Sequence, residues 1–208
     1  MDGITFRPAR RGDLDDICQI LYDEPPAEAM AVAGDAGRAR RVGRILVHAE
    51  TAVHLNRTTM ALLNGRPVGL VAIGERGDRL DPSAAAILRV LIQATPIVGI
   101  AGLRRYARLQ SLRSRVESPH PPDSWYIAEL DVDAAYRNHG VGGALLTYTE
   151  EGARGKGYRR MSLGTQTTNP AQHLYERHGF RIVATRTNAE YERFTGVPGR
   201  VLMVKDLE

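Results

Sequence analysis

The sequence predicts an α+β fold in which helices flank a central, mostly antiparallel sheet. Residues 58–74 read as two strands joined by Asn64-Gly65, which supplies the two positive-φ positions of a tight hairpin turn. A strand-like alternation at 126–132 leads through a glycine-bearing loop into residues with helical spacing from Val141 onward. Two further strand-like runs complete the sheet as antiparallel partners: residues 180–185 and 200–205.

The N-terminal region is expected to hold a short strand and two helical segments. A first strand at 4–8 precedes Asp13, which can cap a helix whose apolar residues recur at helical spacing. Cys18 falls on that apolar stripe and is interpreted as a packing residue, not a nucleophile. A second helical region is expected from about Gly37 to Val53, with its arginines on a solvated face.

Length and composition are compatible with a single domain spanning residues 1–208. A chain of 208 residues with 43% hydrophobic residues can fill a sizeable core. The single cysteine excludes an internal disulfide framework, and no secretory signal opens the sequence, so a cytoplasmic location is expected. The most apolar run, 87–103, is interrupted by polar residues and is too short to span a bilayer comfortably. The net charge of +4 favours anionic ligands but does not by itself indicate nucleic acid.

The loop at 137–142, Arg-Asn-His-Gly-Val-Gly, has the features of an anion site. Gly140 and Gly142 leave backbone N–H groups uncovered, and the helix that follows directs its positive dipole end at the same place. A diphosphate is the anion that suits such a loop best. Other glycine motifs do not fit: a dinucleotide fingerprint needs glycine where Leu145 stands, and Gly157 follows the only Gly-Lys pair where a P-loop needs Ser or Thr.

Two motifs, in the right order, resemble the GNAT family of acyl-CoA N-acyltransferases. Arg137, Gly140 and Gly142 match the family signature Arg/Gln-x-x-Gly-x-Gly/Ala. Residues 169–180 resemble the family's second conserved helix, which ends in Leu-Tyr-x-x-x-Gly-Phe. The resemblance covers residues 126–185. It implies a GNAT-type mixed sheet and an N-acetyltransferase that transfers an acetyl group from acetyl-CoA to a primary amine by direct attack in a ternary complex.

The resemblance also implies where acetyl-CoA binds. The strand Leu130-Asp131-Val132 would pair its main chain with the pantetheine arm, and the 137–143 loop would bind the diphosphate. Asn169 resembles an asparagine that contacts the pantetheine in relatives, and Tyr175 matches the tyrosine usually proposed to protonate the leaving sulfur. The expected donor-binding residues are Leu130, Asp131, Val132, Arg137, Asn138, His139, Gly140, Val141, Gly142, Gly143 and Asn169.

Amide formation needs a group that accepts a proton from the attacking amine. Glu129 is the expected general base, because many GNAT relatives carry a glutamate on this strand; a water chain, or a structural or acceptor-binding role, is the alternative. Asp131 lies two residues on, hence on the same face of the strand, and is the alternate base. Two carboxylates facing one cleft would raise one pKa and attract a cationic amine. The histidines lack metal-binding spacing, so no metal is expected.

The acceptor pocket is expected from segments that carry no recognisable motif. One is a basic helical insert at about 81–117, between the third and fourth strands, with Asp81-Pro82 as its helix start and a second helix after Pro96. The insert is interpreted as a helical cover with a polar face, and a lid, a dimer contact or an anionic docking surface are alternatives. The polar segment Asn188–Gly199 is expected to be a mobile loop near the acceptor.

Two functional hypotheses from different classes remain. The first is an N-acetyltransferase acting on a small-molecule or peptide amine, and an acyltransferase using a longer acyl-CoA is its variant. The second is a non-catalytic acyl-CoA-binding or interaction module in which the basic insert docks a partner. Retention of Tyr175 with Glu129 favours catalysis, since binding alone needs only the 137–142 loop. No nucleic-acid or membrane partner is expected, and a homodimer stays open.

Overall fold

A computed structural model of the chain describes residues 3–74 and 84–207. Its centre is a seven-stranded sheet with the order β1-β2-β3-β4-β5-β7-β6, in which every pairing except the parallel β4–β5 pair is antiparallel. The strands are β1 (Ile4–Pro8), β2 (Thr58–Leu63), β3 (Arg66–Gly74), β4 (Ser124–Val132), β5 (Arg160–Gln166), β6 (Arg181–Thr187) and β7 (Gly199–Asp206). The predicted mixed, mostly antiparallel sheet is therefore confirmed.

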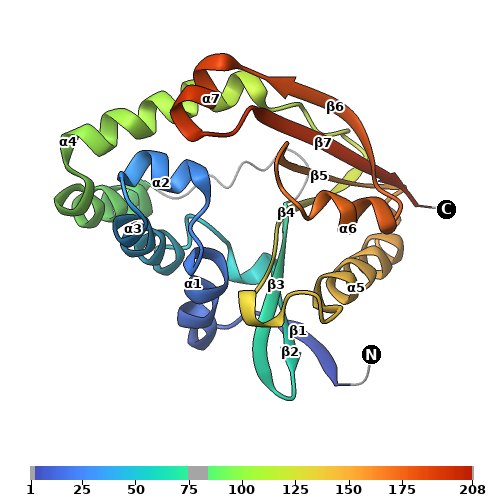
Figure 1. Cartoon of the computed structure of the whole chain (residues 1–208). Coiled ribbons are helices and arrows are strands. Elements are labelled where there is room, and N and C mark those ends of the chain that lie inside the picture. The colour runs from blue at the N-terminus through green and yellow to red at the C-terminus, as the bar shows by residue number, and fades with distance from the viewer. Residues whose placement is uncertain (1–2, 75–83, 208) are drawn as a thin grey trace.

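Helices cover both faces of this sheet (Figure 1). They are α1 (Leu14–Tyr22), α2 (Ala27–Ala33), α3 (Ala36–His48), α4 (Ala84–Val116), α5 (Val141–Gly155), α6 (Gln172–Arg177) and α7 (Ala189–Thr195). Helices α5 and α6 lie on one face, whereas α1, α2, α3 and α4 lie on the other. The long α4 connects β3 to β4, which confirms the predicted insert, while its expected start at Asp81-Pro82 lies outside the described residues.

The helical boundaries differ from prediction at two places. The region expected as one helix at 37–53 ends at His48, and it is preceded by α2, which the left-handed Gly34 (φ 92°) separates from α3. In α4 the break expected at Pro96 falls instead at Gly99, where φ is 64° and ψ is −178°. Only glycine adopts this conformation readily, so the chain bends at the glycine and not at the proline.

The segment Asn188–Gly199, expected to be a mobile loop, contains helix α7. The Asn188 side chain caps this helix by accepting hydrogen bonds from the backbone N–H groups of Glu190 (3.0 Å) and Tyr191 (2.9 Å). Tyr191 is fully buried against α4, and Gly196 ends the helix in the left-handed conformation. The expectation of a mobile loop was wrong, because the Asn188 cap and the buried Tyr191 side chain stabilise a helix in a segment whose composition is polar.

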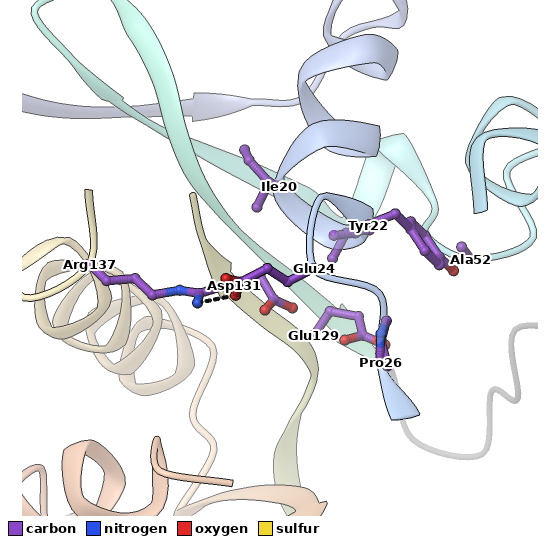
Figure 2. A pocket seen from close by; sticks show the side chains of 9 residues that line it. Ile20, Tyr22, Glu24, Pro26, Ala52, Glu129, Asp131 and Arg137 are labelled. Atoms are coloured by element: carbon purple, nitrogen blue, oxygen red, sulfur yellow. Dashed lines mark hydrogen bonds and ion pairs between the residues drawn. The ribbon is translucent and has the colours of Figure 1, made fainter. Parts of the chain in front are cut away.

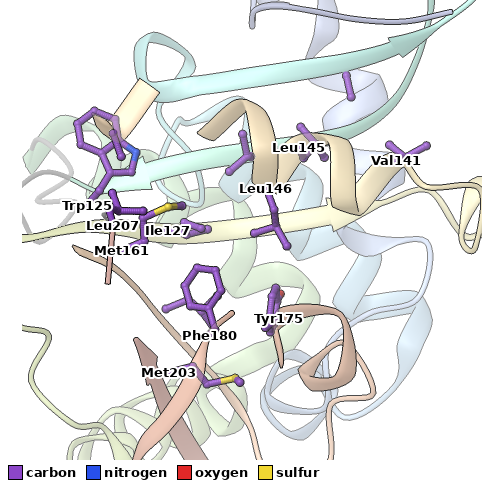
Figure 3. Packing of buried hydrophobic residues seen from close by; sticks show 14 of the residues in the cluster. Trp125, Ile127, Val141, Leu145, Leu146, Met161, Tyr175, Phe180, Met203 and Leu207 are labelled. Atoms are coloured by element: carbon purple, nitrogen blue, oxygen red, sulfur yellow. The ribbon is translucent and has the colours of Figure 1, made fainter. Parts of the chain in front are cut away.

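Each face of the sheet carries an apolar core. The larger core lies between the sheet and helices α5 and α6 (Figure 3) and includes Trp125, Ile127, Leu145, Leu146, Met161, Tyr175, Phe180 and Met203. The second core lies beneath α1 and α3 and includes Ile17, Ile20, Val47, Met60 and Leu70. Cys18 packs against this second core, and burial raises the pKa of its thiol to about 11, in agreement with a packing role.

A bulge in β4 decides which of its side chains share a face. In the register with β3, Ala128 is the extra residue between Ile127 and Glu129. Ile127, before the bulge, and Leu130, after it, both contact the core beneath α5. Glu129 and Asp131 consequently face the opposite side of the sheet, toward α1.

Gly43 on α3 gives a test of how tightly α3 packs against Tyr22, the last residue of α1. An added Cβ at Gly43 would lie 2.3 Å from the Tyr22 ring, so Gly43→Ala is expected to destabilise the fold by about 1–3 kcal/mol. Gly152→Ala in α5 is the matched control, since no atom lies within 4 Å of the added Cβ, and it is expected to stabilise by about 0.5–1 kcal/mol. Thermal unfolding measures both, and equal effects would mean that Tyr22 yields freely.

Candidate functional site

The parallel strands β4 and β5 separate partway along the sheet. Their pairing ends at Ile127 and Leu163, after which β4 continues with β3 and β5 continues with β7. Within the described part of the chain, no strand pairs with the facing edges of residues 128–132 and 164–166. Because backbone N–H and C=O groups need hydrogen-bond partners, these edges are available to an extended ligand.

The loop between β4 and α5 contains the predicted anion-binding glycines. Gly140 is the N-cap residue of α5 with a φ of 81°, and no side chain caps the helix, so its first N–H groups are not covered from within the loop. Asn138 also has a positive φ, 64°. His139 is exposed, and its Nδ1 lies 2.8 Å from the carbonyl oxygen of Arg137. The loop therefore presents uncovered backbone donors at the positive end of a fifteen-residue helix.

Glycine at the start of α5 also lets α6 approach closely. An added Cβ at Gly142 would lie 2.9 Å from Leu174 Cδ2. This close packing holds Tyr175 of α6 in the core beneath α5, where its ring meets the Phe180 ring edge-on at a centroid distance of 6.1 Å (Figure 3). A packing role for Gly142 thus adds to its predicted role in anion binding.

Tyr175 is 5% exposed, and its hydroxyl has no hydrogen-bond partner among the described residues. Among residues 3–74 and 84–207, Trp125 Nε1 is the one fully buried side-chain nitrogen or oxygen that lacks a hydrogen-bond partner. The Tyr175 hydroxyl oxygen is therefore not fully buried. Burial, followed by the charges of Asp131 and Glu129, raises the pKa of the Tyr175 hydroxyl. The group is therefore protonated at neutral pH, as a proton donor must be.

A cleft between α1, the segment that joins α1 to α2, and β4 brings three carboxylates together (Figure 2). Glu129 and Asp131 enter it from β4, on one face as predicted, and Glu24 enters from the opposite wall. The lining residues are Ile20, Leu21, Tyr22, Glu24, Pro26, Ala52, Glu129, Asp131 and Arg137. The cleft therefore combines an apolar wall from α1 with a negatively charged floor from β4.

The two β4 carboxyl groups have raised pKa values. Burial between the cleft walls raises the pKa of Glu129, although its side chain stays open to water along the cleft, and the nearby Arg113 and Arg200 oppose the shift. Burial and the charge of Glu129 raise the pKa of Asp131 to about 8, with Arg137 opposing. The pair therefore carries fewer than two negative charges at neutral pH.

A set of charged groups behind Glu129 is not predictable from the sequence. Glu28 on α2 forms ion pairs with Arg113 of α4 (3.6 Å) and Arg200 of β7 (3.4 Å), and accepts a hydrogen bond from the Tyr191 hydroxyl (2.5 Å). These contacts hold α2, α4, α7 and β7 together beside the cleft and keep two arginines near Glu129. No local pattern reveals the network, because its members lie far apart in the sequence.

Arg137 connects the loop to the cleft. Its Nη1 forms an ion pair with Glu24 (Figure 2), and its Nε donates to the carbonyl oxygen of Val132 at 3.2 Å. Both charged side chains are largely exposed, at 46% for Arg137 and 62% for Glu24, so the pair contributes about 0–1 kcal/mol at most. Arg137 can therefore exchange Glu24 for a more highly charged anion at small cost.

Asn169 lies on the β5 side of the opening. Its Nδ2 donates to Thr165 Oγ1 at 2.7 Å, and its Oδ1 accepts from the backbone N–H of Ala171 at 2.9 Å. These contacts fix the turn before α6, so the side chain is already engaged locally.

Among residues 3–74 and 84–207, no group of three or more His, Cys, Asp or Glu side chains could hold a metal ion.

Comparisons with known proteins agree on one family and fold. The model of the acetyltransferase (GNAT) family matches residues 14–180. A search of curated proteins finds no match. Similar solved structures include an acetyltransferase (19% identity, TM-score 0.56, covering 98% of this chain and 100% of that chain) and Ard1 from Thermoplasma volcanium (13%, 0.57, 99% and 99%). Another is the PaiA N-acetyltransferase from Thermoplasma acidophilum in complex with coenzyme A (13%, 0.56, 98% and 99%).

The raised pKa of Asp131 predicts how stability depends on pH. Its value of about 8 exceeds the ordinary value of about 3.9, so between these pH values the folded state binds more protons, and stability falls as pH rises. Asp131→Asn cannot ionise and is expected to be more stable than wild type at about pH 9, by about 1 kcal/mol or about 2–4 °C in Tm. The difference should vanish near pH 4 in thermal unfolding. A constant difference across that range would contradict the assignment.

Proposed function

Since the chain belongs to the acetyltransferase (GNAT) family, we propose that it is an N-acetyltransferase that transfers the acetyl group of acetyl-CoA to a primary amine. One observation carries this proposal: the open edge of β4 separates a proton donor from a proton acceptor. Tyr175 lies on the α5 side of the sheet, and Glu129 lies on the α1 side. A thioester held at this edge would have its leaving sulfur and its attacking amine on opposite sides.

The chain offers groups that fit each part of coenzyme A. Residues 128–132 of β4 present main-chain donors and acceptors to the amide-bearing pantetheine arm, with Leu130, Asp131 and Val132 as the proposed contacts. The 137–143 loop offers the backbone donors of Gly140, Val141, Gly142 and Gly143 to the diphosphate, and the adjoining Arg137 adds positive charge. The structurally similar PaiA protein was solved with coenzyme A, which supports this donor.

The reaction joins the amine nitrogen to the thioester carbonyl carbon and breaks the carbon–sulfur bond. Glu129 accepts the proton that the amine loses, directly or through water, with Asp131 as the alternate base. Tyr175 gives its proton to the departing sulfur. No covalent intermediate on the protein is required, and Cys18, a packing residue of the second core, takes no part. A protonated amine first loses one proton to water; from the neutral amine onward, Glu129 takes the proton that nitrogen loses and Tyr175 gives the proton that sulfur gains.

The charge of the cleft supports a cationic acceptor. Glu24, Glu129 and Asp131 line the same space with one arginine, Arg137, so carboxyl groups outnumber cationic groups, and a protonated amine is favoured there before it loses its proton. The raised pKa of Glu129 makes that carboxylate a stronger base than an ordinary glutamate. A small amine or an exposed peptide amine both meet these requirements.

Thiol release from acetyl-CoA in the presence of a panel of amines tests the proposal. Wild-type protein is expected to release thiol only when a suitable amine is present. Tyr175→Phe is expected to lower kcat by about 100-fold, because the proton donor is lost, and to leave acetyl-CoA affinity in calorimetry unchanged. Equal losses of turnover and affinity would make Tyr175 a packing residue.

Two further variants in the same assay identify the base. Glu129→Gln is expected to lower kcat/KM strongly and to abolish the fall in activity toward acid pH, whereas Asp131→Asn is expected to keep that fall. The reverse result assigns the base to Asp131. Tight binding of acetyl-CoA without turnover on any amine would favour a non-catalytic acyl-CoA-binding module instead.

A further inference from the structure

The first half of α4, residues 84–98, packs in an unusual direction. Its small inward residues face the protein: Ala94 and Val98 are buried, and Ala86 and Val90 are partly buried. Its large aliphatic residues point outward, and we call them the α4 apolar face: Ile87 (45% exposed), Leu88 (58%), Leu91 (44%) and Ile92 (65%). In an ordinary surface helix the large apolar residues face the core. This reversal means that, among the described residues, nothing covers the α4 apolar face, as is typical of a surface that contacts another partner.

The apolar character extends over a long stretch of this helix. An 18-residue window of α4 has a mean hydropathy of 1.8, and only 11% of that window is buried. By length and composition alone, such a helix could cross a membrane. Beyond the kink at Gly99, Ile100 is also exposed, at 67%.

The topology of the sheet rules out a membrane crossing by α4. Helix α4 follows β3 and precedes β4 in the chain. These two strands are hydrogen-bonded neighbours from Gly69↔Val132 to Gly74↔Tyr126. One crossing would place paired strands on opposite sides of a bilayer. If α4 meets a membrane, it must therefore lie on the surface of the bilayer.

The charge of α4 identifies the kind of surface that it fits. Its 33 residues include six arginines and neither Asp nor Glu, and three of the arginines (Arg105, Arg113 and Arg115) bind other parts of this chain. Arg89 and Arg104 are exposed and have no ion-pair or hydrogen-bond partner among the described residues. An α4 helix from a second copy would offer no acid to Arg89 or Arg104 and would leave both charges unpaired. An anionic bilayer offers an apolar interior to the aliphatic residues and negative headgroups to the arginines.

We propose that the α4 apolar face docks on an anionic lipid surface. The side chains of the α4 apolar face enter the boundary between headgroups and acyl chains. Arg89 and Arg104 contact the negatively charged headgroups. From the sequence no membrane partner is expected, because the apolar run at 87–103 is too short to span a bilayer comfortably. The exposure of these side chains, which the sequence does not reveal, changes that expectation.

Vesicle flotation of the full chain tests the proposal. The protein is expected to float with vesicles that contain phosphatidylglycerol and phosphatidylcholine, and much less with phosphatidylcholine alone, and added salt should weaken the binding. Leu88→Asp combined with Ile92→Asp is expected to reduce binding by about tenfold or more. Thiol release without vesicles should be unchanged, because neither residue lies in the cleft.

Edge strand β6 provides a matched control. Ile182 (44% exposed) and Val183 (48%) are also exposed aliphatic residues, so the double change to Asp removes the same kind of surface and adds the same charge. This control should keep full vesicle binding. If the Leu88→Asp, Ile92→Asp variant is unfolded, as judged by the absence of a thermal unfolding transition, the Leu88→Ser, Ile92→Ser variant replaces it.

A fluorescent label gives a second readout. Ile92→Cys in a Cys18→Ala background, labelled with an environment-sensitive dye, should shift its emission to shorter wavelength when anionic vesicles are added, whereas a label at Ile182→Cys should not. The proposal is overturned by absent flotation or by equal loss in the β6 control. It is also overturned if the chain is a dimer that the Leu88→Asp, Ile92→Asp variant converts to monomer, since the surface then belongs to a second copy.

Discussion

The separation of β4 from β5 is the constraint on which the candidate site depends. Each strand keeps one antiparallel neighbour, β3 for β4 and β7 for β5, and those ladders diverge beyond Ile127 and Leu163. Backbone groups on the two facing edges cannot satisfy each other across the gap, so they need water or a ligand. The fold thus maintains, in the middle of a sheet, the kind of edge that is usually found only at its rim.

The bulge at Ala128 turns this edge into a site with two chemically different sides. Apolar residues of β4 on both sides of the bulge face the α5 core, where Tyr175 is held, while Glu129 and Asp131 face the α1 cleft. A regular strand would place Glu129 on the same face as Ile127, which lies in that core. One inserted residue therefore keeps a proton donor and two candidate bases apart across a single strand.

Local signals in the sequence sufficed for the elements that local chemistry determines. Asn64-Gly65 predicted the hairpin because the turn needs two positive φ angles, and the structure has 52° and 81° there. The 137–142 loop was recognised from its glycines before a helix start, and the helix that carries Tyr175 was recognised from its resemblance to the second GNAT motif. In contrast, the contacts of Glu24 with Arg137 and of Glu28 with Arg113 depend on how distant elements pack. The spacing of residues along the chain therefore does not predict them. The outward direction of Leu88 on α4 is of the same kind.

Hydrogen exchange of the backbone amides with and without coenzyme A tests the central claim most directly. The account predicts that coenzyme A slows exchange at 128–132 on the open edge of β4 and at 137–143 at the start of α5. Amides of β1 and β2, at the far edge of the sheet, should not change. Protection confined to other segments, or no protection at a saturating concentration of coenzyme A, would contradict the claim that this strand edge and loop bind the acyl donor.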